Sequence, residues 1–267
     1  AQYGGASSAV LDIIARTGRS DRWGGNASIG LISAKASVEG PIVKDKLMML
    51  FNVRRSYIDL FMKPIKKYRD NSLYFFDTNL KLDWRINDRN KMYLSFLGSH
   101  DQTRLNDLVD MRWSNLAGSL TWGHNFRGLS SSQTTLFAYS YQTNNGIHIG
   151  GMDIEYLGHI RHLGLRQNFQ LLWGHHELNM GAQTMISDVK SAEWLRWNNR
   201  EKEQRKGWDN RAWVNWQFSP LKQLTTSAGL YLTAFSALGG PYYYDIDEKG
   251  NITWIYKRQK NLPVKTS

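Results

Sequence analysis

The sequence predicts an all-β fold, a transmembrane antiparallel β-barrel, from three observations. The first is a strict alternation in residues 77–86, where one set of side chains is charged or amide and the interleaved set is apolar apart from Thr78: Asp77, Asn79, Lys81, Asp83 and Arg85 against Thr78, Leu80, Leu82, Trp84 and Ile86. Successive side chains of a strand point to opposite faces, so this strand has one polar and one apolar face. The second is that the pattern recurs along the chain, with no segment to cover the apolar faces. The third is that no run of eighteen apolar residues exists, which excludes a transmembrane helix. We therefore expect lipid against the apolar face and a lumen against the polar face.

The connections alternate between short and long, as in a barrel with short turns at one rim and longer loops at the other. Short turns are predicted at residues 43–46, 87–90, 127–131, 160–164 and 219–223. Longer segments are predicted at residues 61–72, 102–111, 181–209 and after Leu238, and residues 143–146 are a short exception on the long side. On this interpretation the short turns face the periplasm.

The strands between these connections are expected to turn their apolar residues to lipid. In order, these residues are Met49, Phe51 and Val53; Met92, Leu94 and Phe96; Leu116, Leu120 and Trp122; Phe137, Tyr139 and Tyr141; Met152, Ile154 and Tyr156; Phe169, Leu171 and Trp173; Val214, Trp216 and Phe218; and Leu224, Ala228, Leu230 and Leu232. Residues 26–39 form one long strand or a tight hairpin, giving roughly ten or eleven strands. Soluble β-sandwiches alternate too, so the repetition is what favours a barrel.

Tryptophans lie in or near the ends of these strands, where an indole can leave its ring in lipid and its N–H in the headgroup layer. The predicted belt comprises Trp84, Trp113, Trp122, Trp173, Trp208, Trp213 and Trp216. The alternative for the same residues is the core of a sandwich.

The formal net charge of +11 comes from dispersed basic residues, in runs at 63–69, 196–206 and 257–260. We expect these runs to be solvated loops or to contact an anionic lipid headgroup or ligand. Nucleic acid is not an expected partner, because the basic residues do not gather on one element. The chain has no cysteine, which excludes disulfides and thiolate metal sites.

A series of short motifs at the amino end occurs in a recognisable order. They are Tyr3-Gly4-Gly5-Ala6-Ser7-Ser8-Ala9-Val10-Leu11-Asp12-Ile13, Arg16-Thr17, residues 28–35, Glu39-Gly40-Pro41-Ile42 and Arg54-Arg55-Ser56-Tyr57. Together they resemble the plug-to-barrel junction of TonB-dependent outer-membrane receptors, in the form common in Bacteroidota. Residues 77–83 and 94–101 resemble the barrel strands that follow in that family.

The resemblance implies a protein of the bacterial cell outer membrane with about 22 strands around a plugged lumen. Residues 1–20 would be the C-terminal end of the plug domain, and residues 21–267 the N-terminal half of the barrel. The chain would then be a fragment, a partly traced protein or one piece of a split barrel.

The junction residues implied by the resemblance are Tyr3, Gly4, Gly5, Asp12 and Arg54. The two glycines allow the backbone to turn or to approach another backbone closely. By the two-residue alternation of the strand, Arg54 points inward, where it could hold a plug carboxylate. Arg55 falls on the opposite face. Ala6 stands where family members usually carry an arginine, which removes one expected plug anchor.

The function implied by the resemblance is active transport of a scarce nutrient ligand, with outer-membrane lipid and a TonB-type energy-coupling protein as partners. The coupling protein would act through a plug segment that is not in this chain. The ligand is open among iron chelates, cobalamin, oligosaccharides and peptides. The alternatives are a receptor-like barrel that is a structural subunit of a larger outer-membrane complex, and an outer-membrane enzyme or simple porin.

No catalytic residue, cofactor or metal is predicted, because the chain lacks a Gly-x-Ser-x-Gly elbow, a phosphate-binding glycine loop and a His-Glu-x-x-His motif. A hairpin about residues 161–162 would set His148 opposite His176, but a polar lumen or rim position is favoured over a metal site. Two carboxylate pairs are expected on lumen faces, Asp153 with Glu155 and Asp77 with Asp83. We expect them to pair with Lys or Arg.

Two aromatic segments are candidate contacts for a ligand or for a lid-like surface lipoprotein. Residues 191–209, with Trp194 and Trp197, are predicted to form a folded surface loop, with a short amphipathic helix inside an external loop as the alternative. The run Tyr242, Tyr243 and Tyr244 could stack on a sugar or peptide.

Overall fold

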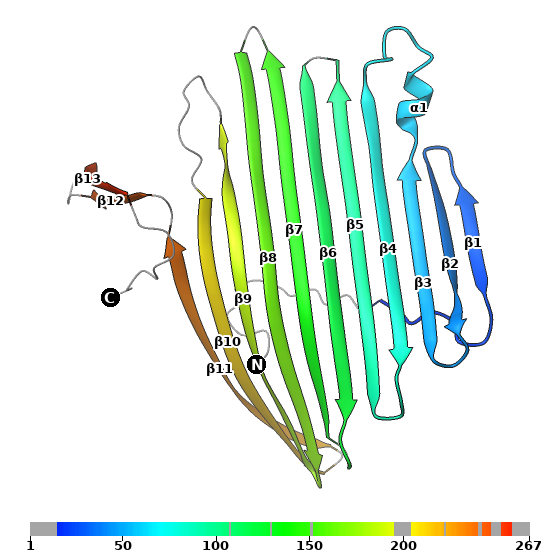
Figure 1. The fold of residues 1–267 in the computed structure, drawn as a ribbon, viewed down its shortest axis with the longest axis vertical. Helices are drawn as coiled ribbons and strands as arrows, with labels where there is room; N and C mark the ends of the chain where they lie inside the picture. The colour runs from blue at the N-terminus through cyan, green and yellow to red at the C-terminus, as the bar shows by residue number, and fades with distance from the viewer. Residues whose placement is uncertain are drawn as a thin grey trace.

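The computed structural model describes residues 15–106, 108–128, 130–149, 152–194, 204–221, 223–239, 242–246 and 252–257. Within them, eleven strands form one curved antiparallel sheet in chain order, and a two-stranded sheet follows (Figure 1). The strands are β1 (Gly24–Ile29), β2 (Ser33–Val43), β3 (Leu47–Ser56), β4 (Ser72–Arg85), β5 (Asn90–Leu105), β6 (Val109–Asn125), β7 (Ser131–Ile149), β8 (Met152–Trp173), β9 (His176–Trp194), β10 (Gln204–Leu221), β11 (Leu224–Gly239), β12 (Tyr242–Ile246) and β13 (Ile252–Lys257). The described helix is α1 (Ile58–Met62).

Cross-strand register gives the sheet two distinct faces. On the inner face, Asp77 of β4 lies beside Ser99 of β5, which lies beside Asn115 of β6. On the outer face, Leu80 lies beside Phe96. Because paired residues of neighbouring strands point to the same side, each row extends across the whole sheet.

Almost no apolar side chain is buried in the described part of the chain. The buried hydrophobic residues are Met48, Leu50 and Trp213, all on the inner face by register, whereas Leu163 of the outer face is 55% exposed. A soluble sheet buries its apolar face beneath a second layer. The described sheet has no such layer (Figure 1). No helix among the described residues is long and apolar enough to cross a membrane.

The predicted number of strands is confirmed, and residues 26–39 form the hairpin of β1 and β2. The short turns at 43–46, 87–90 and 127–131 and the longer segment at 61–72 also lie between strands to within one residue, whereas β10 continues to Leu221 through most of the predicted turn at 219–223. The predicted turn at 160–164 is wrong, since β8 is unbroken and the chain turns at Gly174 and His175. Gly164 instead leaves room for the ring of Phe137, which a Cβ would overlap.

Three predicted connections on the long side are also strand. β5 and β6 continue into the predicted segment 102–111, β7 runs through residues 143–146, and β9 and β10 occupy both ends of 181–209. The ends of β5 and β6 are joined by Asp110, which accepts hydrogen bonds from Arg104 and Arg112. Here the alternation of β6 is reversed: Val109, Met111 and Trp113 face inward, whereas Asp110, Arg112 and Ser114 face outward, so the strand continues with its polar side chains on the outer face.

One strand, β7, and the beginning of β8 face the opposite way from the prediction, whereas Phe169, Leu171 and Trp173 later in β8 face outward as predicted. Phe137, Tyr139 and Tyr141 lie on the inner face, because Tyr141 pairs with Asn115. Ile154 and Tyr156 are also on the inner face by the β7–β8 register. The hydroxyl of Tyr139 donates to Asn115 Oδ1 at 3.1 Å. Tyrosine is therefore a lumen residue here, and the small side chains between the aromatics face outward.

Candidate functional site

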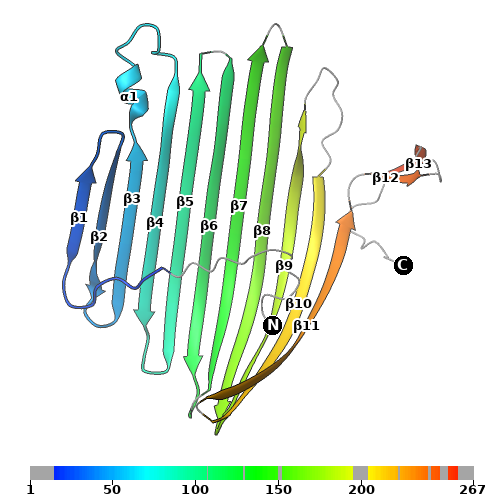
Figure 2. The same ribbon diagram turned by 180° about the vertical axis from the view of Figure 1, so that it is seen from behind.

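The candidate site is on the inner face, where residues 15–23 cross β3 and β2 on the way to β1 (Figure 2). We call residues 15–23 the strap. Lys81 Nζ of β4 donates to the Ala15 carbonyl at 2.5 Å, and the Arg16 guanidinium donates to both carboxylate oxygens of Glu39 in β2, at 2.5 and 3.0 Å. Trp23 lies against Gly40, where a Cβ would be 2.8 Å from the Trp23 Cα. The strap is thus fastened to β2 and β4.

Gly18 brings the strap backbone into direct contact with β3. A Cβ at this position would overlap the backbone carbonyl group of Met49, which cannot rotate away as a side chain could. Only glycine allows this approach. Met48 and Leu50 are 1% and 3% exposed on this part of the inner face. The strap therefore gives the sheet its only described apolar core besides Trp213.

A buried carboxylate, Asp83 of β4, lies in the same region and is 3% exposed. Lys81 Nζ is 3.8 Å from Asp83 Oδ1 and is itself largely shielded. A buried charge needs a partner of opposite sign. Lys81 therefore has two roles, as it neutralises Asp83 in the wall and holds the Ala15 carbonyl of the strap.

An ion pair at the exposed end of the strap is independent of this buried group. Arg19 donates to both carboxylate oxygens of Asp21, at 3.1 and 2.9 Å. The hydrogen bond from Arg19 lowers the pKa of Asp21 to about 2. Since the pKa of Asp21 is lower in the folded state, the pair contributes fully to folding stability above the ordinary pKa of an aspartate. This contribution is lost as the pH falls through about 2.

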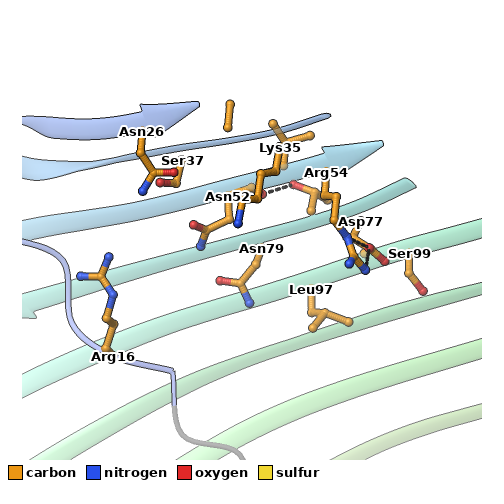
Figure 3. Close-up of a pocket in the computed structure, with 14 residues that line it drawn as sticks. Arg16, Asn26, Lys35, Ser37, Asn52, Arg54, Asp77, Asn79, Leu97 and Ser99 are labelled. Atoms are coloured by element: carbon orange, nitrogen blue, oxygen red, sulfur yellow. Dashed lines mark hydrogen bonds and ion pairs between the residues drawn. The ribbon is translucent and has the colours of Figure 1, made fainter. Parts of the chain in front are cut away.

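A polar cavity of about 590 Å³ opens beside the strap (Figure 3). Its lining includes Arg16, Lys35, Arg54, Asp77 and three asparagines, Asn26, Asn52 and Asn79. Arg54 is bound to Asp77 at 2.8 and 2.5 Å, whereas Lys35 makes no ion pair among the described residues. The cavity can accept a polar chain that carries carboxylates or backbone carbonyls.

Arg54 points inward, as the two-residue alternation predicts, but the carboxylate it binds is Asp77 of the neighbouring strand. Arg55 is on the opposite face and binds Asp59 at 3.0 Å. The other junction residues, Tyr3, Gly4, Gly5 and Asp12, lie outside the described residues. The junction role of these residues stays a prediction.

The aromatic contact residues that the structure describes belong to separate strands. The predicted loop at 191–209, and the helix considered as its alternative, are both wrong at the two ends, because Ser191–Trp194 belong to β9 and Gln204–Asp209 to β10. Trp197 lies outside the described residues. Tyr242, Tyr243 and Tyr244 begin β12, where Tyr243 pairs with Tyr256 of β13. Their role in binding a ligand or partner stays a prediction.

The histidine pair considered from the sequence is separated. His148 lies opposite Asp153 in the β7–β8 hairpin, while His176 stacks on Phe218 with ring centroids 4.6 Å apart. Glu155 is on the outer face by register, which is a correction to its predicted lumen position. Among the described residues, no three histidines or carboxylates form a group that could hold a metal.

Part of the predicted tryptophan belt is present on the outer face at the short-turn end, where Trp84, Trp122, Trp173 and Trp216 are exposed. Trp122 Nε1 donates to Asn90 Oδ1 at 3.1 Å. Trp208 is also on the outer face, toward the other rim. The belt prediction is wrong for Trp113 and Trp213, because both face inward by register. Trp213 is buried against Gly181.

Comparison with known proteins gives a match of fold. No family model matches the sequence, and no curated protein matches it. A solved structure named copper transporter OprC superposes with a TM-score of 0.61 at 9% identity, covering 85% of this chain and 39% of that one. At this identity the match shows the fold alone, and the chain spans well under half of that protein. The predicted fold class, an all-β antiparallel sheet of the outer-membrane barrel type, is confirmed.

Proposed function

We propose that the chain is part of a TonB-dependent outer-membrane transporter that imports a scarce nutrient ligand. Residues 1–20 are the end of its plug domain, and residues 21–267 form the N-terminal half of its barrel wall. A TonB-type coupling protein acts on a plug segment that is not in this chain.

The observation that carries the proposal is the strap on the inner face. A simple barrel wall needs no chain segment fastened across its lumen side. Here a segment immediately before β1 binds Glu39 and Lys81 and lies against the Met49 backbone. This is the geometry required where a plug inside a barrel continues into the first wall strand.

The outer face supports a position in lipid. On β8, outward residues from Trp173 to Leu163 span ten residue steps, roughly 33 Å along the strand at about 3.3 Å per residue. With a strand tilt of about 40°, the band is about 25 Å tall, the height of the apolar band in outer-membrane barrels. The strands β5 to β11 have 16 to 22 residues, and so extend beyond the membrane.

The barrel fold shared with a copper transporter supports transport as the function, while its cargo is not carried over at 9% identity. The ligand class and the Bacteroidota form rest on the motif resemblance. The structural-subunit alternative is favoured by no observation in the described residues.

In the proposed mechanism, force on the plug is resisted at the strap. The contacts of Ala15, Arg16 and Gly18 hold the last plug residues to β2, β3 and β4, so that upstream plug residues can move while the end remains fixed. The ion pairs and polar side chains of the neighbouring cavity supply a surface on which plug residues can rearrange without exposing an apolar core.

The test is growth on single limiting nutrients in strains that lack either this protein or the coupling protein. We expect both deletions to abolish growth on the same nutrient, and the protein to fractionate with the outer membrane. Unimpaired growth on every nutrient in the first strain would contradict transport. Stable co-purification of further envelope subunits in that case would favour the structural role, and single-channel conductance through an open lumen would favour a porin.

A further inference from the structure

Basic side chains gather on the outer face immediately beyond the apolar band. Arg161 follows Leu163 in the outward set of β8, and His159 follows Arg161. Lys190 of β9 lies beside His159, and Arg112 of β6 lies on the same face two strands away. These positions are toward the rim with the longer loops, at the depth where the apolar band gives way to headgroups.

A cavity of about 390 Å³ joins these residues, which come from neighbouring strands β5 to β9 (Figure 1). It is lined by Arg112, Arg161, Lys190, His100 and His159, together with hydroxyl and amide side chains and Leu157. No carboxylate lines it. We call this the basic hollow.

Nearby carboxylates neutralise only part of this charge. Asp110 is shared by Arg104 and Arg112, and Asp188, which lies opposite Arg161 in the β8–β9 register, is 3.7 Å from His159 Nε2. Arg161 is exposed and makes no ion pair or side-chain hydrogen bond within the described residues. Arg161 is therefore available to a bound anion.

A second hollow of about 390 Å³ continues from the first toward the apolar band. Both are lined by His100, Ser114 and Gln142, and the second adds Phe76, Phe96 and Leu116. Gly98 forms part of its wall. We call this the apolar groove. A basic hollow joined to an apolar groove matches a molecule with an anionic head and a hydrocarbon tail.

We propose that this surface binds a phosphorylated lipid of the outer leaflet. Its phosphate lies on Arg161, Lys190 and Arg112, and an acyl chain lies in the apolar groove against Phe96 and Leu116. The proposal rests on the membrane position proposed above. A free phosphate would use the basic hollow alone, so the groove favours the lipid as the source of the phosphate.

The test uses the protein in phosphatidylcholine vesicles with phosphorylated lipid A, with the same lipid after removal of its phosphates, or with added inorganic phosphate. Vesicle flotation reports insertion, and native mass spectrometry reports bound lipid. The variant is R161Q/K190Q, and the matched control is K44Q/R89Q, which removes two exposed charges at the short-turn rim.

We expect R161Q/K190Q to lose about thirtyfold in affinity for phosphorylated lipid A, from about fivefold for each basic residue near a membrane surface. The control should bind as the unmodified protein does, and the dephosphorylated lipid should bind more weakly. Equal binding of both lipids, equal binding by the double variant, or competition by inorganic phosphate at the same affinity as the lipid would overturn the proposal. If the protein floats with the vesicles but shows no preference for phosphorylated lipid A, only the proposed lipid site is contradicted. If the protein does not float, the proposed membrane position is contradicted as well.

Discussion

Leucines in two regions of this sheet differ in what covers them. Leu50, near the strap, is 3% exposed, whereas Leu163 of the outer face is 55% exposed although it belongs to an outward row of β8, from Leu163 to Trp173, that is apolar except at Gln167. In the first region the chain covers its own apolar residues. In the second the described residues supply no covering layer, as the proposed position in lipid requires. Local composition cannot separate these cases, because the same residue type is present in both.

The largest effect is expected from cavity formation beneath the strap. Leu50→Ala should destabilise the protein by about 2–5 kcal/mol, because a buried site loses transfer energy and keeps a cavity. Leu163→Ala should cost about 2 kcal/mol or less, because lipid chains refill the space and only the transfer loss remains. Urea unfolding in vesicles, followed by tryptophan fluorescence, measures both. Equal losses would mean that both leucines are covered in the same way.

The two faces can be compared by introducing an arginine at each of two adjacent residues, in separate variants. Val214 points outward near the middle of the band on β10, and Asn215 points inward. Val214→Arg should cost about 2–4 kcal/mol at the bilayer midplane. Asn215→Arg should be close to neutral, because a polar lumen hydrates the new charge. The same unfolding assay applies, and similar costs at the two positions would count against a lipid-facing Val214.

The strap can be displaced through Gly18. Gly18→Ala should cost about 1–3 kcal/mol, because its Cβ overlaps the Met49 backbone and the strap must shift. Gly30→Ala is the matched control, since its Cβ would lie at an ordinary 3.4 Å from the Ser33 carbonyl oxygen. Limited trypsin cleavage after Arg16 and Arg19 should accelerate only in the Gly18 variant. Unchanged protection in that variant would show that the strap does not lie against β3.

The smallest effect is expected at Arg54. Its pair with Asp77 is exposed, with 54% and 37% of the two side chains accessible. Arg54→Gln should therefore change stability by about 0.2–1 kcal/mol, and less at high salt. A loss of several kcal/mol in the unfolding assay would indicate that Arg54 also holds a plug group, as the sequence suggests.

The sequence predicts the fold best in the part of each strand that lies in the proposed membrane, where one face has to be apolar. On β4, β5, β10 and β11 the apolar residues face outward as predicted, because only that face must be apolar throughout. On β7 and β8 the tyrosines mislead, since a phenol can contact either lipid or a polar lumen. Beyond the apolar band the alternation of β6 reverses, with Asp110, Arg112 and Ser114 outward, and the extensions of β5 and β6 are consequently missed.

The site was less accessible to sequence reasoning. Arg54 could be placed inward from alternation alone, but its partner Asp77 depends on the register between β3 and β4. The contacts of Lys81 with Ala15 and of Arg16 with Glu39 join residues 66 and 23 positions apart. The one sequence signal for the strap was the Arg16-Thr17 motif, followed by Gly18.

The most direct test is a spin-label scan of β8, from residue 161 to residue 171, in lipid vesicles. The protein has no cysteine, so single cysteines can be introduced on a clean background. Oxygen, which concentrates in lipid, should relax labels at 163, 165, 169 and 171, while a water-soluble nickel reagent should relax labels at 162, 166, 168 and 170, and Gly164 is left unlabelled because a Cβ there would overlap Phe137. Shielding of the odd-numbered positions from both reagents would show that protein, and not lipid, covers the apolar face.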